Sequence, residues 1–215
     1  MVPQKLRILF IIPSLEEGGA ERVLVNLLKK FDFDRYEVDL CVVEKRGIYF
    51  GEIPAQVKVI TLFSNELTCK VFNGLHVRYN FNFTYRWLAN WKISGHYDIG
   101  ISFLDSGFTD ILFFLKSKIS RKISWVHSSY QTYRNFEKFY TGAYKKRVIK
   151  HRYSKLDTIV FVSNDSKMEF EGIFGHFLSM KVIYNMIDAS GVRDKAEAPV
   201  SEPFDPNVTN IIALG

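Results

Sequence analysis

Cysteine is scarce in this chain, which has only Cys41 and Cys69 among its 215 residues. The two lie in unrelated contexts without the short spacing of metal ligands, so we predict two free thiols and a reducing compartment. Four scattered histidines also lack zinc-ligand spacing, and they are His76, His96, His151 and His176. The pattern therefore predicts no metal site.

Long apolar runs are also missing, because no segment approaches the ~20 apolar residues that span a bilayer. Lys5 and Arg7 precede an apolar run, as in a signal peptide, but that run stops at Pro13 and two acids follow it. It is too short for a leader and lacks a small-residue cleavage site. We therefore expect a cytoplasmic protein.

The rest of the composition is typical of a globular, basic protein. Hydrophobic residues make up 47% and aromatic residues 15% of the chain, which excludes a disordered polypeptide. The net charge is +6 and the sequence pI is about 9.2. This balance suits an anionic partner such as a nucleotide, a phospholipid surface or a nucleic acid.

The opening of the chain has the pattern of a strand, a glycine turn and a helix. Residues 8–12 form a continuous apolar run, as in a strand buried on both faces. Residues 20–31 repeat apolar side chains at helical spacing. Gly18 and Gly19 lie at the mouth of that helix, where backbone N–H groups and the helix dipole favour an anion, most often a phosphate. A tight turn without a ligand explains the two glycines equally well.

Strand-like and helix-like stretches alternate along the rest of the chain, which predicts an α/β fold with a doubly wound parallel sheet. Further strands are expected at 36–44, 57–62, 97–103, 122–126, 158–162 and 181–184. Helices are expected at 65–91, with a break near 73–74, at 108–116, at 135–153, and after Ser163 or Asn164 as a cap.

The end of the chain changes character. Residues 190–209 are polar and contain three prolines, which predicts a linker after a domain of residues 1–189. Residues 210–215 then begin a new apolar strand. We expect this strand to be the first element of a truncated second domain.

Candidate functional residues follow several predicted strands. In a doubly wound sheet, ligands bind beyond the carboxyl ends of the strands. Gly18 and Gly19, Asp105, and His127 with Ser128 would all lie there. Asp105 suits a sugar hydroxyl, although it could instead cap the next helix. His127 could exchange a hydrogen bond in the cleft, or it could be satisfied by a backbone carbonyl.

Other motifs argue against competing functions. The opening loop is not G-x-G-x-x-G, so Glu44 at the end of the second strand is weak support for a nucleotide-dependent oxidoreductase. The D-x-D at residues 32–34 follows a helix and is interpreted as a solvated turn. No nucleic-acid motif occurs.

A basic run covers residues 144–153, where Lys146, Arg147 and Lys150 group on a helix opposite Val148 and Leu156. A solvated helix face explains it. A docking surface for anionic lipid headgroups explains it as well, since nearby Lys and Arg contribute about 1 kcal/mol each. A non-catalytic basic module docking on membrane or nucleic acid is the corresponding alternative function.

Several segments, in chain order, resemble motifs of the family 4 retaining glycosyltransferases, which have the two-domain GT-B fold. These are Gly18-Gly19-Ala20-Glu21-Arg22, residues 101–105, Trp125-Val126-His127, residues 159–163, residues 184–188 and residues 211–215. One departure is Met186, which stands where the family usually has glycine.

The resemblance implies a Rossmann-like N-terminal, acceptor-side domain of a metal-independent enzyme. Such an enzyme transfers a sugar from a nucleotide-sugar to a glycan or lipid-linked acceptor, as in cell-surface polysaccharide synthesis. Gly18 and Gly19 would face the donor diphosphate, Glu21 or Arg22 would reach the acceptor, and His127 would contact the donor sugar. The donor pocket would lie in the missing domain, so this fragment is expected to be inactive.

Overall fold

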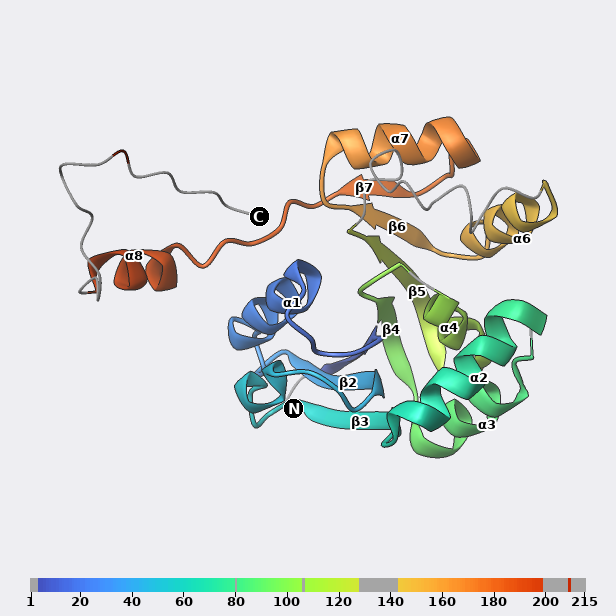
Figure 1. Cartoon of the computed structure of the whole chain (residues 1–215), viewed down its shortest axis with the longest axis horizontal. Helices are drawn as coiled ribbons and strands as arrows, with labels where there is room; N and C mark the ends of the chain where they lie inside the picture. The colour runs from blue at the N-terminus through green and yellow to red at the C-terminus, as the bar shows by residue number, and fades with distance from the viewer. Residues whose placement is uncertain (1–3, 80, 106, 128–142, 199–208, 210–215) are drawn as a thin grey trace.

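The computed structural model describes residues 4–79, 81–105, 107–127, 143–198 and 209. Seven strands form one parallel sheet in the order β3-β2-β1-β4-β5-β6-β7 (Figure 1). Their bounds are β1 Leu6–Ile12, β2 Tyr36–Glu44, β3 Lys58–Phe63, β4 Tyr97–Ser102, β5 Ile119–Val126, β6 Thr158–Phe161 and β7 Met180–Val182. The predicted doubly wound α/β fold is confirmed, and its strand order reverses direction between β1 and β4.

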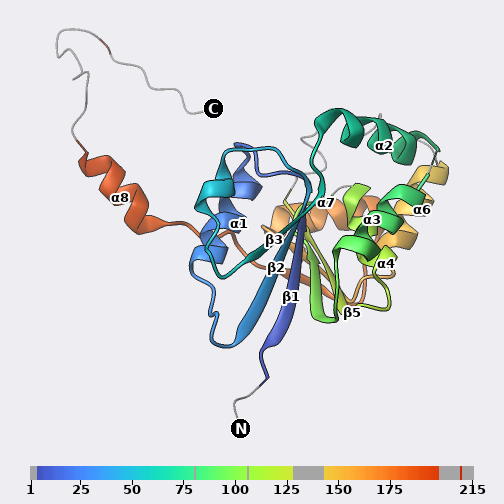
Figure 2. The same cartoon turned by 90° about the horizontal axis from the view of Figure 1, so that it is seen from below.

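Helices connect the strands on both sides of the sheet. The longer ones are α1 Gly19–Lys29, α2 Glu66–Tyr79, α3 Phe83–Lys92, α6 Ala143–Tyr153, α7 Asn164–Phe174 and α8 Ala189–Glu197. The short ones are η1 Tyr49–Glu52, η2 Gly107–Asp110 and α4 Ile111–Phe114. Figure 2 shows α1 on one side of the sheet and α2, α3, α4 and α6 on the other.

The core is divided between the two faces of the sheet because successive strand residues point to opposite sides. Ile8, Phe10 and Ile12 of β1 pack with the buried Leu24 and Leu28 of α1. The alternate β1 residues join a second cluster with α3 and α4, and a third cluster joins β5 and β6 to α6 and α7. Burial on both faces is why the opening strand is apolar at every position.

The predicted break near residues 73–74 is wrong, because α2 continues through Asn73 and Gly74 to Tyr79. A single glycine inside a helix costs about 1 kcal/mol relative to alanine. Burial of Cys69 and His76 on the inner side of α2 outweighs that cost. The chain instead turns before α3, which begins after Asn82.

Two smaller predictions, on the cysteines and on the D-x-D, agree with the structure. Cys41 and Cys69 are both free and buried, and burial raises the pKa of the Cys41 thiol to about 12. The D-x-D is a turn, in which the Asp32 carboxylate accepts the N–H groups of Asp34 (3.1 Å) and Arg35 (3.3 Å). The part of the chain with described coordinates has no cluster of three or more His, Cys, Asp or Glu residues that could hold a metal.

A helix, α8, occupies the first part of the stretch expected to be a linker, and sequence reasoning missed it. It stands apart from the sheet in Figures 1 and 2. Lys30 at the end of α1 lies 3.7 Å from Asp188, just before α8. The strand expected at 210–215 and the beginning of the helix expected from 135 lie outside the described residues.

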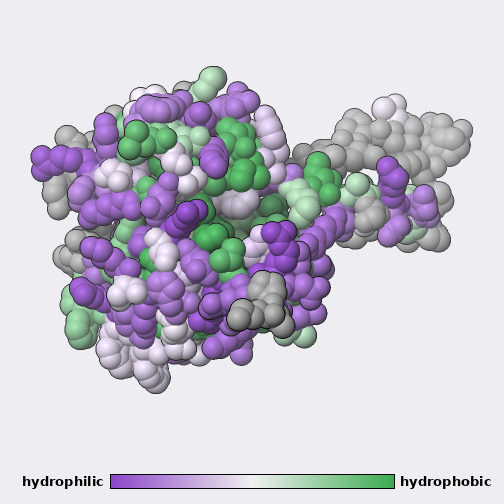
Figure 3. All heavy atoms as spheres, turned by 180° about the vertical axis from the view of Figure 1, so that it is seen from behind, coloured by the Kyte–Doolittle hydropathy of each residue, from purple (hydrophilic) through white to green (hydrophobic). Residues whose placement is uncertain are grey.

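No helix within the described ranges is both long and apolar enough to cross a membrane. Seen from behind, the surface is largely hydrophilic at its periphery, and apolar side chains gather in the hollowed middle of that face (Figure 3).

Candidate functional site

The β1–α1 turn lies where the strand order reverses, and this is the ligand-binding position of open α/β sheets. Gly18 is the N-cap of α1 and has an extended backbone, with φ −82° and ψ 155°. Among the described residues, no atom beyond its chain neighbours and helix backbone lies within 4 Å of the place that a Cβ on Gly19 would take. The space beside Gly19 at the start of α1 is therefore not filled by described atoms.

The carboxylate of Glu21 lies over Gly18. A Cβ on Gly18 would come within 2.0 Å of Glu21 Oε2, so a larger residue there would displace this side chain. A carboxylate is favourable at the positive end of a helix dipole. An anionic ligand at the same place would require the Glu21 side chain to turn away.

Arg22 points toward η1. Its guanidinium lies 4.2 Å from the centre of the Tyr49 ring and 2.8 Å from the Glu52 carboxylate, which Lys29 also contacts at 2.6 Å. The hydrogen bonds from Lys29 and then Arg22 lower the pKa of Glu52. Contact of Arg22 with an acceptor stays a prediction, and it would require this side chain to leave its ion pair.

Gly47 fixes the path of the β1–α1 turn. Leu15 N–H donates to the Arg46 carbonyl at 2.8 Å, and Tyr49 N–H donates to the Leu15 carbonyl at 3.3 Å. Gly47 has φ +124°, and a Cβ there would lie 1.9 Å from the Leu15 carbonyl atoms. Sequence reasoning did not single out Gly47, because nothing in a sequence tells which backbone packs against a given glycine.

His127 follows β5 directly and lies among aromatic rings. Its ring centre is 4.7 Å from that of Phe103 and 6.0 Å from that of Trp125. Phe103 and Trp125 belong to the same core cluster as α1, so His127 is on the α1 side of the sheet. Burial lowers the pKa of His127 to about 4, and the imidazole is therefore neutral near pH 7.

Two buried polar atoms at this place are left without a hydrogen-bond partner among the described residues. They are Nε2 of His127 and Nε1 of Trp125. Buried polar groups are nearly always paired, so each exception calls for a reason. A bound ligand with hydroxyl or phosphate oxygens would satisfy both atoms.

The strand register places the candidate residues at one edge. Ile11 of β1 is level with Ser102 of β4, which is level with Ser124 of β5. Asp105 and His127 each follow three residues later, and α1 begins shortly after β1 at the same edge. The diglycine, Asp105 and His127 therefore all follow strands at the carboxyl edge of the sheet, and their shared role in one site stays a prediction.

Asp105 contacts α6, because its carboxylate accepts a hydrogen bond from the Tyr153 hydroxyl. The neighbouring Arg152 donates two hydrogen bonds to Asp110, at 2.7 and 3.0 Å, in the bidentate geometry that makes such pairs strong. His76 of α2 lies 3.6 Å from the same carboxylate. The buried side of α6 thus holds the loop that follows β4, and sequence reasoning missed this contact.

The family model described as Glycosyltransferase Family 4 matches residues 17–190. The chain belongs to glycosyltransferase family 4. Its fold is also similar to crystal structures of Anabaena Alr3699/HepE, at 18% sequence identity over 89% of this chain and 50% of that chain. The complex with UDP and glucose gives a TM-score of 0.52, and the complex with UDP-glucose gives 0.51. No curated protein matches the chain.

The family 4 domain spans about half the length of those structures. Its fold is the Rossmann-like N-terminal half of a GT-B glycosyltransferase. At 18% identity, the similarity to the solved structures shows only the fold. The roles of individual residues must therefore come from the geometry of this chain.

Two of the predicted residues are not placed by the structure. Ser128 lies outside the described residues, and so does the side chain of Lys146. Arg147 and Lys150 are exposed on α6, which is compatible with a docking face. Val148 was expected on the opposite, apolar face of this helix, but it is 42% exposed, whereas Ile149 and Tyr153 are buried. That part of the helix assignment is wrong, because Ile149 and Tyr153 are the residues that meet β5, β6 and α7.

Proposed function

We propose that this family 4 domain is the acceptor-side half of a retaining, metal-independent glycosyltransferase. The enzyme would transfer a hexose from a nucleotide-sugar to a glycan or lipid-linked acceptor, in the synthesis of a cell-surface polysaccharide or another glycan. The observation that carries the proposal is the carboxyl edge of the sheet. There the start of α1 shares an edge with Nε2 of His127, which has no hydrogen-bond partner among the described residues. The complexes of the Anabaena neighbour with UDP and UDP-glucose support a nucleotide-sugar donor.

Glycosyl transfer places negative charge on the departing diphosphate and positive charge on the sugar. Backbone N–H groups of Gly18 and Gly19 at the start of α1 would stabilise the diphosphate, because a helix N-terminus carries partial positive charge. The neutral imidazole of His127 would exchange a hydrogen bond with the donor sugar without adding a positive charge beside it. Asp105 and Ser128 would line the same edge, and Glu21 and Arg22 would face the acceptor.

The domain arrangement follows from the same proposal. Residues 1–189 would form the acceptor-side domain, residues 190–209 the connection that includes α8, and residues 210–215 the first strand of a donor-binding domain. Stabilising the leaving diphosphate requires a closed cleft with little water. Half of that cleft would not turn over substrate.

A transfer assay tests this function. Residues 1–215 are incubated with a panel of UDP-, GDP- and ADP-sugars and with glycan and polyprenyl-linked acceptors, and products are followed by mass spectrometry. We expect no product from the chain alone. A polypeptide that continues into a donor-binding domain should form product, and EDTA should not reduce its rate. Full transfer by residues 1–215 would contradict the half-cleft arrangement, and loss of activity with EDTA would contradict metal independence.

We also propose that the enzyme works in the cytoplasm, as a peripheral protein at the inner face of the cell membrane. The exposed Arg147 and Lys150, together with Lys146, would provide a basic surface on α6. No nucleic-acid partner is proposed.

A further inference from the structure

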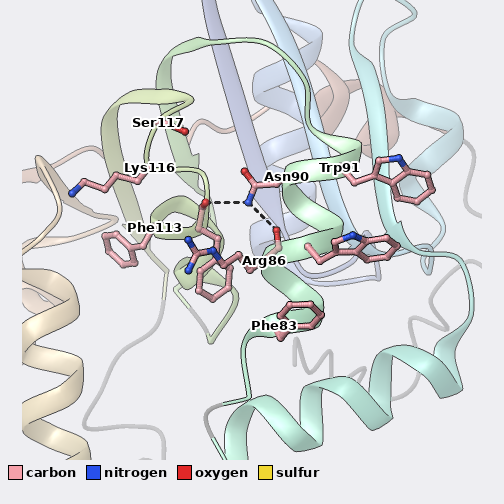
Figure 4. A pocket seen from close by; sticks show the side chains of 9 residues that line it. Phe83, Arg86, Asn90, Trp91, Phe113, Lys116 and Ser117 are labelled. Carbon is pink, nitrogen blue, oxygen red and sulfur yellow. Dashed lines mark hydrogen bonds between the residues drawn. The ribbon is translucent and has the colours of Figure 1, made fainter.

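Helix α3 exposes a row of large aromatic side chains. Phe83, Trp87 and Trp91 follow one another at intervals of four residues, which places them on one side of a helix. They are 69%, 55% and 66% exposed, and the rings of Trp87 and Trp91 stack with centres 5.5 Å apart. Figure 4 shows the rings of Phe83 and Trp91 projecting from α3. Contiguous exposed apolar patches on a soluble domain usually mark an interaction surface.

A groove of about 920 Å³ lies beside this row, between α3 and the end of α4. Asn90 donates a hydrogen bond to the Phe114 carbonyl at 3.2 Å, which ties the two walls together, and a second one within α3 to the Arg86 carbonyl at 2.8 Å (Figure 4). The charged residues that line the groove are Arg86 and Lys116, and both are cations. The groove is therefore a fixed, basic and aromatic surface.

Charge is distributed unevenly along the chain in a way that matches this surface. Residues 67–156 contain sixteen Lys and Arg against four Asp and Glu, whereas the rest of the chain contains thirteen against nineteen. Three of those four acids accept hydrogen bonds within the fold, from the backbone of Arg7, from Tyr153 and from Arg152. The segment supplies α2, α3, α4 and α6, and Figure 2 shows these helices on the side of the sheet opposite α1. The described cations of these helices, among them Lys70, Arg86 and Lys150, therefore belong to that side of the sheet.

The basic side of α6 by itself offers charge with little apolar surface, since Val148 is its one exposed large hydrophobic side chain among those described. We propose that the α3 surface, made of Phe83, Trp87, Trp91, Arg86 and Lys116, docks on an anionic lipid bilayer. Tryptophan rings favour the headgroup level of a membrane, and neighbouring cations are attracted to anionic headgroups. The inference deepens the membrane association proposed above by assigning a second surface that inserts.

Co-sedimentation with vesicles tests the docking surface. The full chain is mixed with vesicles of phosphatidylcholine alone or with about 30% phosphatidylglycerol, at an ionic strength of about 0.1 M. We expect retention on the anionic vesicles. The double variants Trp87→Ala/Trp91→Ala and Arg86→Glu/Lys116→Glu should each lower the partition coefficient by at least about tenfold. Leu178→Ala and Lys181→Glu are matched controls at exposed sites outside this surface, and they should bind normally.

Tryptophan fluorescence shows whether the same rings enter the lipid. The chain has three tryptophans, so Trp125→Phe leaves Trp87 and Trp91 as the reporters. Anionic vesicles should shift their emission to the blue, and brominated lipids should quench it. Unchanged emission, or normal binding by the tryptophan double variant, would overturn the proposal. Retention on a soluble glycan in place of vesicles would also overturn it. The vesicle experiments need no donor or acceptor, so a failure to bind vesicles would not affect the transferase proposal. In the same way, a lack of transfer activity would not affect an observed binding to vesicles.

Discussion

Replacing His127 by alanine should lower the rate of sugar transfer by about 10²–10³-fold in the enzyme that contains this domain, while the fold stays intact. The reason is its position, directly after β5 and beside Phe103 and Trp125, with Nε2 buried and without a partner among the described residues. A ligand at the carboxyl edge of the sheet would give this atom a hydrogen-bond partner. Losing the ring removes that interaction with the sugar and leaves the aromatic core in place.

Steady-state kinetics and circular dichroism together check this prediction. His127→Gln, which retains a hydrogen-bonding group, should lose less activity than His127→Ala. His96→Ala is a suitable control, because His96 is exposed at the opposite edge of the sheet and contacts Ser120 at 2.7 Å. Normal turnover by folded His127→Ala would remove His127 from the site.

The pH dependence of stability gives an independent readout for His127. Burial lowers its pKa to about 4 in the folded protein, against about 6.5 when unfolded. The folded state therefore binds fewer protons than the unfolded state between these values, and the stability from neutral His127 is complete above pH ~6.5 and is lost as pH falls toward 4. His127→Gln should flatten that part of the profile.

Substituting alanine for Gly47 should lower the free energy of unfolding by roughly 2–4 kcal/mol. The added Cβ would meet the Leu15 carbonyl at 1.9 Å, in a backbone conformation with φ +124° that other residues rarely adopt. Leu15 lies three residues before Gly18 in the same turn, so relieving the collision would move the proposed ligand-binding turn. Transfer activity should therefore fall at temperatures where the variant is still folded.

Urea denaturation measures the first effect, and Gly51→Ala is its matched control. Gly51 lies in η1, has no atom within 4 Å of an added Cβ among the described residues, and should be neutral or slightly stabilised as alanine. Equal stability of Gly47→Ala and Gly51→Ala would show that the turn tolerates displacement, and Gly47 would lose its positioning role.

Most of the fold could be predicted from the sequence, because strands and helices are specified by patterns of neighbouring residues. Apolar runs such as that of β1 and the periodic face of α1 directly specify buried strands and helices. The break in the long aromatic stretch was misplaced, because Gly74 has a low helix propensity that tertiary packing of Cys69 and His76 overrides. Propensity is a weak guide wherever packing decides.

The candidate site was predictable where it depends on strand ends and less so where it depends on long-range contacts. The ends of parallel strands meet at one edge, so Asp105 and His127 could be placed together from their positions after β4 and β5. The pairing of Arg152 with Asp110 joins residues 42 positions apart. The packing of Gly47 on Leu15 is likewise a tertiary contact between residues that are far apart in the sequence.

A nuclear magnetic resonance titration of residues 4–198 with a nucleotide-sugar tests the shared edge most directly. Half a pocket should bind UDP-glucose weakly, with a Kd on the order of 1 mM or above. The amide signals of Gly18 and Gly19 and the ring signals of His127 should shift together along one binding curve. Shifts confined to signals at the amino edge near His96 would contradict the shared edge. Signals of Gly19 and His127 that stay unchanged at saturation with UDP-glucose would contradict it as well.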